Sequence, residues 1–293
     1  MKYTLSDKAW NVVFLVIITA VLIAVLYPVI FVISSSFSSG EAIANGEVLL
    51  WPVEFCFTGY QLVLAHQGIW MGYINTIIYT FFGTCVNLVV TTLVAYPFSR
   101  RDMQWRGLYI LLFMIPVFIG GGLVPSYILV SKLHLTDTRL WLIICGAYNM
   151  GNVILLRTAF QSGVPEELWE SAKMDGSSYT KYLLKIVLPL SKATISVITL
   201  YCVVGHWNSY FGPMIYLRDL NKFPLQLIVQ SILSVSQVDS SQIQDVELLS
   251  KLVTATEVMR YALIVVATLP MIIFYPFVQK FFEKGVMVGS VKG

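Results

Sequence analysis

Glu170-Ser171-Ala172-Lys173-Met174-Asp175-Gly176 is the stretch that decides the fold, and Pro189 follows Gly176 by thirteen residues within Ile186-Val187-Leu188-Pro189. It lies between long apolar runs and is the one place where charge, a turn glycine and helical spacing coincide. We interpret it as a docking surface for a cytoplasmic partner, built into a membrane protein. The chain is then one half of a larger machine.

The composition is that of a membrane protein. Of 293 residues, 57% are hydrophobic and 12% are charged, against roughly 25% charged in soluble domains. A bilayer core about 30 Å thick takes about 20 apolar residues to cross. We therefore predict an all-α, polytopic fold of six transmembrane helices in a single domain over residues 1–293. The predicted spans are Trp10–Ser34, Met71–Phe98, Leu108–Val130, Leu140–Leu156, Ile195–Tyr216 and Tyr261–Phe282.

The basic residues set the predicted orientation. With both termini in the cytoplasm, 13 of the 19 Lys and Arg residues fall on the inner side and 6 on the outer side, as the positive-inside rule requires. The apolar core of the first stretch, Val12–Ile33, is longer than the roughly 7–15 residues of a signal peptide, so we predict an uncleaved helix. The chain is expected to be a multi-pass protein of the cell membrane.

The sequence lacks the residues that several classes of membrane protein need for their function. Only His206 is ionisable well inside a predicted span, whereas ion-coupled carriers usually have acids or bases there. No Gly-x-x-x-x-Gly-Lys-Ser/Thr phosphate loop occurs, so any ATP that drives the protein is bound by another chain. Gly120-Gly121-Gly122 predicts either a helix break or a close-packing site in the third span. The cysteines show no metal-ligand spacing, no metal is expected, and the net charge of +3 reflects topology rather than nucleic-acid binding.

The cytoplasmic segment, about residues 161–192, predicts a helix, a tight turn and a second helix. Pro165 suits the first turn, and the acidic side chains that follow it lie near the positive end of the helix dipole. Gly176 is expected to take a left-handed cap, Ser177 to cap the second helix, and Pro189 to end or kink that helix. The alternative is an amphipathic segment lying on the lipid surface, which the glutamates disfavour because the inner leaflet is anionic.

These residues resemble a known family. Glu170-Ser171-Ala172-x-x-Asp175-Gly176-Ser177 and Ile186-x-Leu188-Pro189 are similar to the EAA loop of membrane subunits of binding-protein-dependent ABC importers. Other segments resemble the maltose-type carbohydrate permeases and, more narrowly, a subgroup that handles oligosaccharides from complex polysaccharides. Those segments are Asn75-Thr76, Ala95–Arg100, Gly120–Tyr127, Gly205–Phe211, Tyr216–Asp219, Phe223–Gln226 and Lys284–Gly293.

The resemblance implies a type I ABC importer permease with the MetI-like fold in a bacterial inner (cytoplasmic) membrane. It implies a second homologous permease, two ATPase subunits that bind ATP and Mg, and an extracytoplasmic sugar-binding protein as partners. This chain would itself hold no cofactor and catalyse no reaction. Ser171 departs from the central alanine of the family motif. The residues expected to dock the ATPase are Glu167, Glu170, Ser171, Ala172, Asp175, Gly176 and Ser177.

The resemblance also assigns a role to the C-terminal tail, about residues 283–293. It is expected to reach between the ATPases through Gly285, Gly289 and Lys292.

A substrate path is expected where polar and aromatic side chains interrupt the apolar spans. Sugars are bound by hydrogen bonds and by aromatic faces in otherwise apolar pockets. The residues expected to line the path are His206, Trp207, Asn208, Tyr210, Tyr127 and Asn149. The alternative is that these polar groups bond neighbouring helices, as is common in membranes.

The sequence thus favours the transmembrane subunit of an ATP-driven oligosaccharide importer. Two other functions stay open at this point: an ion-coupled sugar carrier, and an ABC permease for a solute other than sugar. A structural or assembly protein without a transported substrate is a further possibility. The identity of the sugar, and whether this chain or its partner permease holds the main sugar site, are not encoded in any recognisable motif.

Overall fold

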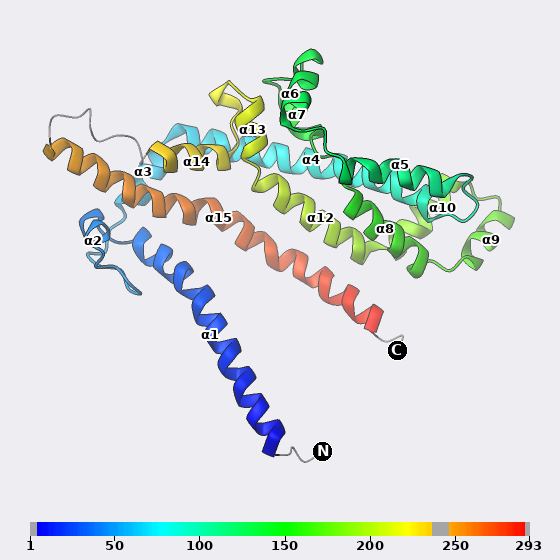
Figure 1. The fold of residues 1–293 in the computed structure, drawn as a ribbon, viewed down its shortest axis with the longest axis horizontal. Helices are drawn as coiled ribbons and strands as arrows, with labels where there is room; N and C mark the ends of the chain where they lie inside the picture. Colours follow the sequence, from blue (N-terminus) through cyan, green and yellow to red (C-terminus); the bar gives the residue numbers. More distant parts are fainter. Residues whose placement is uncertain (1–4, 236–245, 291–293) are drawn as a thin grey trace. The chain divides into compact units, whose positions relative to one another are not determined.

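The computed structural model describes the backbone of residues 5–235 and 246–290 and the side chains of residues 10–234 and 254–276. Throughout the described part the secondary structure is helical, with no strand, as predicted (Figure 1). The helices are α1 (Leu5–Ser36), α2 (Gly40–Ala44), α3 (Thr58–Ala65), α4 (Gln67–Ser99), α5 (Arg106–Phe118), α6 (Leu123–Lys132), α7 (Arg139–Ile144), α8 (Met150–Gly163), α9 (Glu167–Met174), α10 (Tyr179–Tyr182), the π-helical turn η1 (Leu183–Val187), α11 (Leu188–Leu190), α12 (Lys192–Trp207), α13 (Phe211–Tyr216), the 3-10 turn η2 (Leu220–Lys222), α14 (Leu225–Val235) and α15 (Val246–Ser290).

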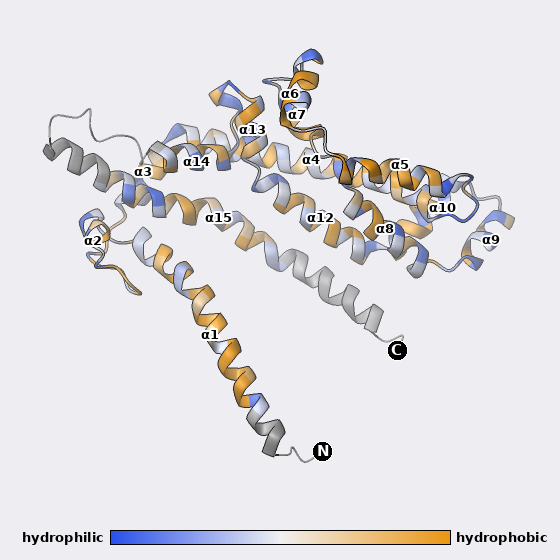
Figure 2. Ribbon diagram, viewed as in Figure 1, coloured by the Kyte–Doolittle hydropathy of each residue, from blue (hydrophilic) through white to orange (hydrophobic). Residues whose placement is uncertain are grey.

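Three helices in the described part are long and apolar enough to cross a membrane: Trp10–Ser36 in α1, Gln67–Ser99 and Thr254–Pro276 in α15. Two bent pairs pass the same test when each pair is taken as one span, which raises the count to five. The predicted number of six is therefore not reproduced. Figure 2 shows the apolar residues that run along α1 and α5, in contrast to the mostly hydrophilic α9.

Breaks at glycine account for the third and fourth predicted spans, while the fifth, Ile195–Tyr216, was wrong as one continuous helix because it is divided between α12 and α13 at residues 208–210. The third predicted span is α5 followed by α6, bent by 110° where Gly122 has a φ of 79°, as the glycine triplet predicts. The fourth predicted span, Leu140–Leu156, was wrong as one continuous helix. It is divided between α7 and α8, because the chain leaves helical geometry around Gly146, whose φ is 75°. Glycine adopts such positive angles without the clash that a Cβ would cause.

By its contacts the chain divides into two compact units. The first comprises Met1–Ile69 and Val229–Leu269. In it, a Cβ on Gly40 would lie 2.2 Å from Thr254 Cγ2 and one on Gly59 would lie 2.7 Å from the Val258 carbonyl oxygen, so both glycines permit close packing on α15. The predicted outer segment after the first span contains the short helices α2 and α3.

The second unit comprises Trp70–Ile228 and Pro270–Gly293 and contains the main described hydrophobic core. Helix α4 contributes Ala95 and Phe98 to this core, while α8 contributes Val153 and Leu156, and α12 contributes Ile198. Helix α8 packs against α12 and α5. Four segments far apart in the sequence are thereby fixed around one apolar centre, on which the cytoplasmic segment also packs.

At the other end of this unit, polar side chains of α4 hold the segment around η2. Asn75 Nδ2 donates to the carbonyl oxygens of Asn221 (2.8 Å) and Phe223 (3.1 Å), and Thr76 Oγ1 accepts from the Leu225 amide (2.8 Å). The Tyr79 hydroxyl donates to the Lys222 carbonyl (2.8 Å). Buried polar groups that are satisfied in this way fix one helix against another in a membrane.

Candidate functional site

The segment predicted to be cytoplasmic, residues 161–192, folds as a helix, a turn and a second helix, as predicted. Helix α9 ends in a Schellman motif: the Ser177 amide donates to the Ala172 carbonyl (2.9 Å) and the Gly176 amide to the Lys173 carbonyl (3.1 Å), with Gly176 at a φ of 69°. The predicted cap of the second helix was one residue off. Ser178, and not Ser177, caps α10 by accepting from the Lys181 amide (3.3 Å).

The second helix then widens and bends. Four residues of α10 pass into the π-helical turn η1 and then into α11, which contains Pro189. The chain turns by 83° at Ser191 before α12 begins. The kink expected beside Pro189 is therefore present, and it joins the cytoplasmic segment directly to an apolar helix.

Helix α9 has one buried and one exposed face. Trp169 and Ala172 are each 8% exposed and belong to the hydrophobic core. Ala172 therefore does not reach the surface on which a partner would dock. The face opposite Trp169 and Ala172 follows the spacing i, i+3, i+4, i+7 and holds Glu167, Glu170, Ser171 and Met174, and it is flanked by Leu168 and Lys173, which are exposed too.

Met174, which is 85% exposed, belongs to this face and was missed by sequence reasoning. Its position seven residues after Glu167 was the available signal. Asp175 caps the C-terminus of α9 and is exposed, as is Gly176.

A cluster of four side chains fastens α9 to the end of α4. The Arg100 guanidinium lies 4.4 Å from the centroid of the Trp169 ring and forms two contacts with Asp102 (3.2 and 3.3 Å). The Tyr179 hydroxyl donates to Asp102 (2.7 Å), and its ring stacks on Trp169 with centroids 4.6 Å apart. We call Arg100, Asp102, Trp169 and Tyr179 the arginine clamp.

Within the clamp, Arg100 and Trp169 are shielded from water, whereas Asp102 and Tyr179 are about half exposed. The side chain of Arg100 is 14% exposed. Burial raises the pKa of Asp102, but the hydrogen bonds from Arg100 and Tyr179 outweigh it, so that the pKa lies below its usual value. Asp102 is thus ionised at neutral pH and holds Arg100 in place over the indole ring, where a cation–π contact is worth about 2 kcal/mol when desolvated.

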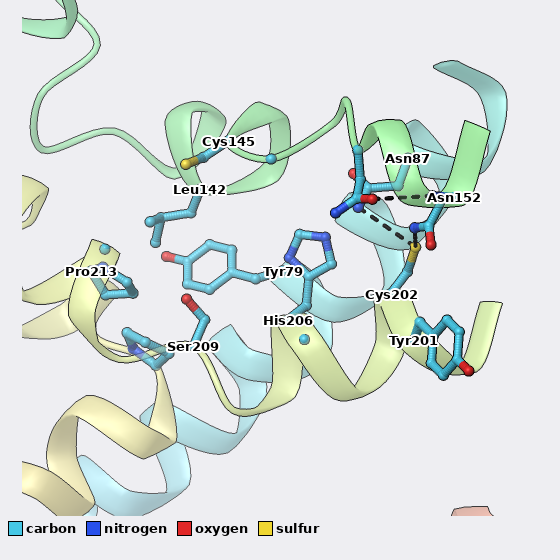
Figure 3. Close-up of a pocket in the computed structure, with 15 residues that line it drawn as sticks. Tyr79, Asn87, Leu142, Cys145, Asn152, Tyr201, Cys202, His206, Ser209 and Pro213 are labelled. Atoms are coloured by element: carbon cyan, nitrogen blue, oxygen red, sulfur yellow. Dashed lines mark hydrogen bonds between the residues drawn. The ribbon is translucent and has the colours of Figure 1, made fainter. Parts of the chain in front are cut away.

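A pocket of about 460 Å³ lies among α4, α7, α8 and α12. Figure 3 shows His206 between Tyr79 and a group formed by Asn87, Asn152 and Cys202. Both amides donate to the Cys202 sulfur, at 3.7 and 3.8 Å. Carboxylates, lysines and arginines are absent from the lining. The lining residues are Tyr79, Asn87, Leu142, Cys145, Gly146, Asn149, Asn152, Tyr201, Cys202, Gly205, His206, Ser209, Gly212, Pro213 and Pro224.

His206 and Asn87 have hydrogen-bonding capacity to spare. His206 Nε2 and Asn87 Oδ1 are buried, and neither atom has a hydrogen-bond partner. The imidazole lies directly on the backbone of α4, because a Cβ on Gly83 would come within 2.5 Å of His206 Cε1. Unsatisfied polar atoms beside a cavity are available to a ligand that brings its own hydroxyl groups.

Of the residues predicted to line a substrate path, the structure brings only His206 and Asn149 to the pocket. Trp207 is buried against Tyr73, with ring centroids 6.3 Å apart. Asn208 donates to the Val204 carbonyl of its own helix (3.0 Å).

The other two predicted residues also lie outside the lining. Tyr127 stacks on Tyr216 at 5.8 Å, and Tyr210 is exposed. Sequence reasoning missed Asn87 and Asn152, whose signal was an amide inside an apolar helix.

The wall of the pocket formed by Pro213 and Pro224 is held by a network around Asp137. Its carboxylate accepts from the amides of Arg218 (3.1 Å) and Asp219 (3.2 Å) and pairs with Lys222 Nζ (3.2 Å). The two amide bonds, followed by Lys222, lower the pKa of Asp137. The carboxylate therefore stays ionised, and the segment that carries Pro213 and Pro224 is fixed.

The predicted tail contacts fall where few details are described. Gly285 and Gly289 lie in the last part of α15, whose side chains are not described, and Lys292 lies outside the described residues. Among the residues described, there is no group of three or more His, Cys, Asp or Glu side chains that could hold a metal ion.

Comparison with known proteins decides the family. The profile described as "Binding-protein-dependent transport system inner membrane component" matches residues 87–288. The chain belongs to this family. A member is the membrane component of an ABC transporter and carries no catalytic site, since ATP hydrolysis takes place on a separate subunit. Membership favours an ATP-driven permease over the ion-coupled carrier.

Two relatives are similar to this chain over nearly its whole length. It is 36% identical over 272 residues to the polygalacturonan/rhamnogalacturonan transport system permease protein YtcP of Bacillus subtilis (strain 168), covering 93% of this chain and 94% of that protein. It is 32% identical over 293 residues to protein LplC of the same organism, covering 100% of this chain and 98% of that protein.

A solved structure is similar over the same length. One chain in the crystal structure of a bacterial ABC transporter involved in the import of the acidic polysaccharide alginate matches with a TM-score of 0.86 and 33% identity. The match covers 96% of this chain and 99% of that chain. The type I permease (MetI-like) fold is thereby shown for this family member.

Proposed function

We propose that this chain is one of two permease subunits of an ATP-driven oligosaccharide importer. The observation that carries the proposal is the exposed acidic face of α9, held by a left-handed glycine turn on one side and by the arginine clamp on the other. Glu167 and Glu170 offer carboxylates to basic residues of an ATPase subunit that holds ATP and Mg. A second, homologous permease completes the translocation path.

In the proposed arrangement, six segments cross the inner membrane of a bacterium and both termini lie in the cytoplasm. The bent pair α5–α6 and the pair α7–α8 each count as one crossing. The tail from about residue 283 reaches toward the ATPases. An extracytoplasmic binding protein delivers the sugar to the side on which η2 lies.

The chemistry of the pocket supports an oligosaccharide as the substrate. Amides, an imidazole and hydroxyls line it, with Tyr79 and Tyr201 as aromatic surfaces and no charged side chain. This set matches the hydroxyls and apolar C–H faces of a sugar ring. The relatives named for polygalacturonan and alginate handle acidic sugars, so a carboxylate on such a sugar would have to be matched outside this pocket.

Motion reaches the pocket from the docking face by two routes. One is the covalent route through η1, α11 and the 83° bend into α12, which carries His206. The other runs through the arginine clamp into α4, which carries Tyr79 and Asn87. Because both helices line the pocket, a displacement of α9 by ATP-driven closure of the ATPases changes the shape of the sugar site.

Copurification tests the proposal. The wild-type chain, expressed with its partners and solubilised in detergent, is expected to retain an ATPase and a second permease. Glu170→Lys is expected to lose most of the ATPase while the chain still inserts into the membrane, because a buried charge pair across an interface loses its attraction and becomes repulsive.

Lys181→Glu is the matched control, a charge reversal at an exposed residue of the same segment that belongs to α10 and not to α9. It is expected to retain the ATPase. Full ATPase retention and sugar uptake by Glu170→Lys would contradict the docking assignment. Uptake of a solute other than sugar by the intact complex would leave the docking intact and overturn the substrate class.

A further inference from the structure

A second cavity, of about 410 Å³, opens at the cytoplasmic end of α4 and α5 and is lined by three arginines. Arg100, Arg101 and Arg106 face it, while Glu166 is the single carboxylate in its lining. Arg101 pairs with Glu166 (3.1 Å), and Arg100 is engaged with Asp102. Positive charge is therefore in excess around a hollow large enough for a small anion.

Of these three arginines, Arg106 is the one without an ion pair to a carboxylate among the described residues. Its Nη1 donates to the Arg100 carbonyl (3.3 Å), which uses one of its five N–H groups and neutralises no charge. Ser99 and Gln161 add polar groups, and Phe160 and Val187 provide an apolar wall. A guanidinium in this setting binds phosphate oxygens in the bidentate manner that arginine favours.

The position of the cavity indicates where the phosphate comes from. Arg106 begins α5, which exposes Leu108, Leu111 and Ile115 along its length. Trp105, which precedes it, is 74% exposed, as is typical of an aromatic anchor at the membrane surface. A phosphate in the cavity would lie at the depth of the head groups, with apolar surface beside it for acyl chains.

We propose that Arg100, Arg101 and Arg106 form a binding site for the phosphate of an anionic phospholipid of the inner leaflet. Basic pockets on the cytoplasmic side of membrane helices are suited to such head groups. The site shares Arg100 with the arginine clamp and Glu166 with the segment that leads into α9. A bound lipid therefore stabilises the docking helix in its place, and lipid composition sets how firmly that helix is held.

The test uses the full chain, purified with the partners that accompany it, in nanodiscs of phosphatidylcholine with a minor share of phosphatidylglycerol. Native mass spectrometry counts the phosphatidylglycerol molecules that remain bound. Wild-type protein is expected to retain one that the double variant Arg101→Gln, Arg106→Gln loses. The apparent affinity is expected to fall about fivefold for each arginine removed.

Two controls separate the site from general charge and from misfolding. The double variant Lys181→Gln, Lys185→Gln removes two exposed cations that do not line the cavity and is expected to keep the lipid. Arg106→Lys preserves the charge and is expected to retain the lipid with weaker affinity. Wild-type retention by the arginine double variant, or equal loss by the lysine double variant, would overturn the proposal.

A further experiment distinguishes a lipid head group from free inorganic phosphate as the occupant of the cavity. In nanodiscs of phosphatidylcholine alone, inorganic phosphate is added and its binding is measured by phosphorus NMR. No binding that depends on Arg106 is expected, which supports the lipid as the occupant. Binding of inorganic phosphate that Arg106→Gln abolishes would overturn the lipid assignment. The count of retained lipid does not require sugar transport, so it stands apart from the proposed function.

Discussion

At the scale of single residues, His206 illustrates how one small neighbour fixes a functional side chain. The imidazole rests on the backbone at Gly83, where a Cβ would come within 2.5 Å of it, and its Nε2 has no partner in a buried position. The side-chain amide of Asn208, two residues later, donates a hydrogen bond to the Val204 carbonyl of the same helix. The two residues are near in sequence and differ in what they can offer to a ligand.

This difference gives a matched pair of variants. His206→Ala is expected to raise the apparent KM for sugar uptake about threefold to tenfold, since a hydrogen bond is worth about 0.5–1.5 kcal/mol net. Asn208→Ala is expected to leave the KM near the wild-type value. Gly83→Ala should behave like His206→Ala, because the new methyl group displaces the imidazole. Uptake kinetics in membrane vesicles measure all three.

An equal effect of the alanine substitutions at residues 206 and 208 would contradict the assignment of the pocket. The comparison is informative only in complexes that retain their ATPase, which copurification establishes for each variant.

At the scale of elements, the arginine clamp gives α4 the same proposed role as α12: each helix transmits motion of α9 to the pocket. Arg100→Ala removes both the cation over Trp169 and the partner of Asp102. The ratio of sugar transported to ATP hydrolysed is expected to fall at least about fivefold, because the clamp contact is worth about 1–2 kcal/mol. ATPase copurification is expected to persist, because the exposed face of α9 is unchanged.

Arg100→Lys separates the two contributions. A lysine keeps a cation near the indole ring but loses the planar fork that bonds Asp102 twice. Its transport ratio is expected to lie between wild type and Arg100→Ala. Wild-type coupling in Arg100→Ala would show that α12 alone transmits the motion.

Local signals in the sequence predict the elements of the docking segment well. Proline, the acidic first turn and Gly176 specify α9, its end and the turn that follows, because caps act within a few residues. The same reasoning finds the break at Gly120-Gly121-Gly122. Capping errors are small: the serine that caps α10 was misplaced by one residue.

The clamp and the pocket could not be predicted in this way. Arg100 and Trp169 meet because α4 and α9 pack on one core, and no local pattern encodes a contact across 69 residues. Ala172 was expected on the docking face, but the rotation of α9 is set by burial of Trp169 and turns Ala172 inward. Likewise, membrane amides such as Asn152 and Asn208 look equivalent until helix rotation separates them.

At the scale of the whole molecule, the membrane topology is the property to test: successive loops are expected to lie on opposite sides of the membrane. Single cysteines are introduced at four exposed positions after the native cysteines are replaced. Glu47→Cys and Lys132→Cys are expected to react with a membrane-impermeant thiol reagent in intact cells. Gln104→Cys and Lys185→Cys are expected to react only after permeabilisation.

The four positions test the crossing of α4, of the bent pair α5–α6 and of the pair α7–α8 separately. Labelling of Lys132→Cys from outside, with Gln104→Cys protected, establishes that α5–α6 crosses the membrane despite its 110° bend. Protection of both would show that this pair returns to the side on which it began. Labelling of Lys185→Cys in intact cells would place the docking face outside and rule out a cytoplasmic ATPase partner.

The π-helical turn at Leu183–Val187 makes the number of residues in the connector matter more than their identity. Each residue of an α-helix advances the azimuth by about 100° and the axis by about 1.5 Å. Because a π-helical turn is an α-helix with one extra residue wound into it, removing one residue here would restore ordinary winding and leave the flanking turns nearly in phase, whereas removing two would swing the acidic face of α9 by about 100° relative to α12. Substitutions at the exposed Leu184 or Lys185 also leave that azimuth unchanged, so the connector is expected to tolerate changes of side chain and the loss of one residue, but not the loss of two.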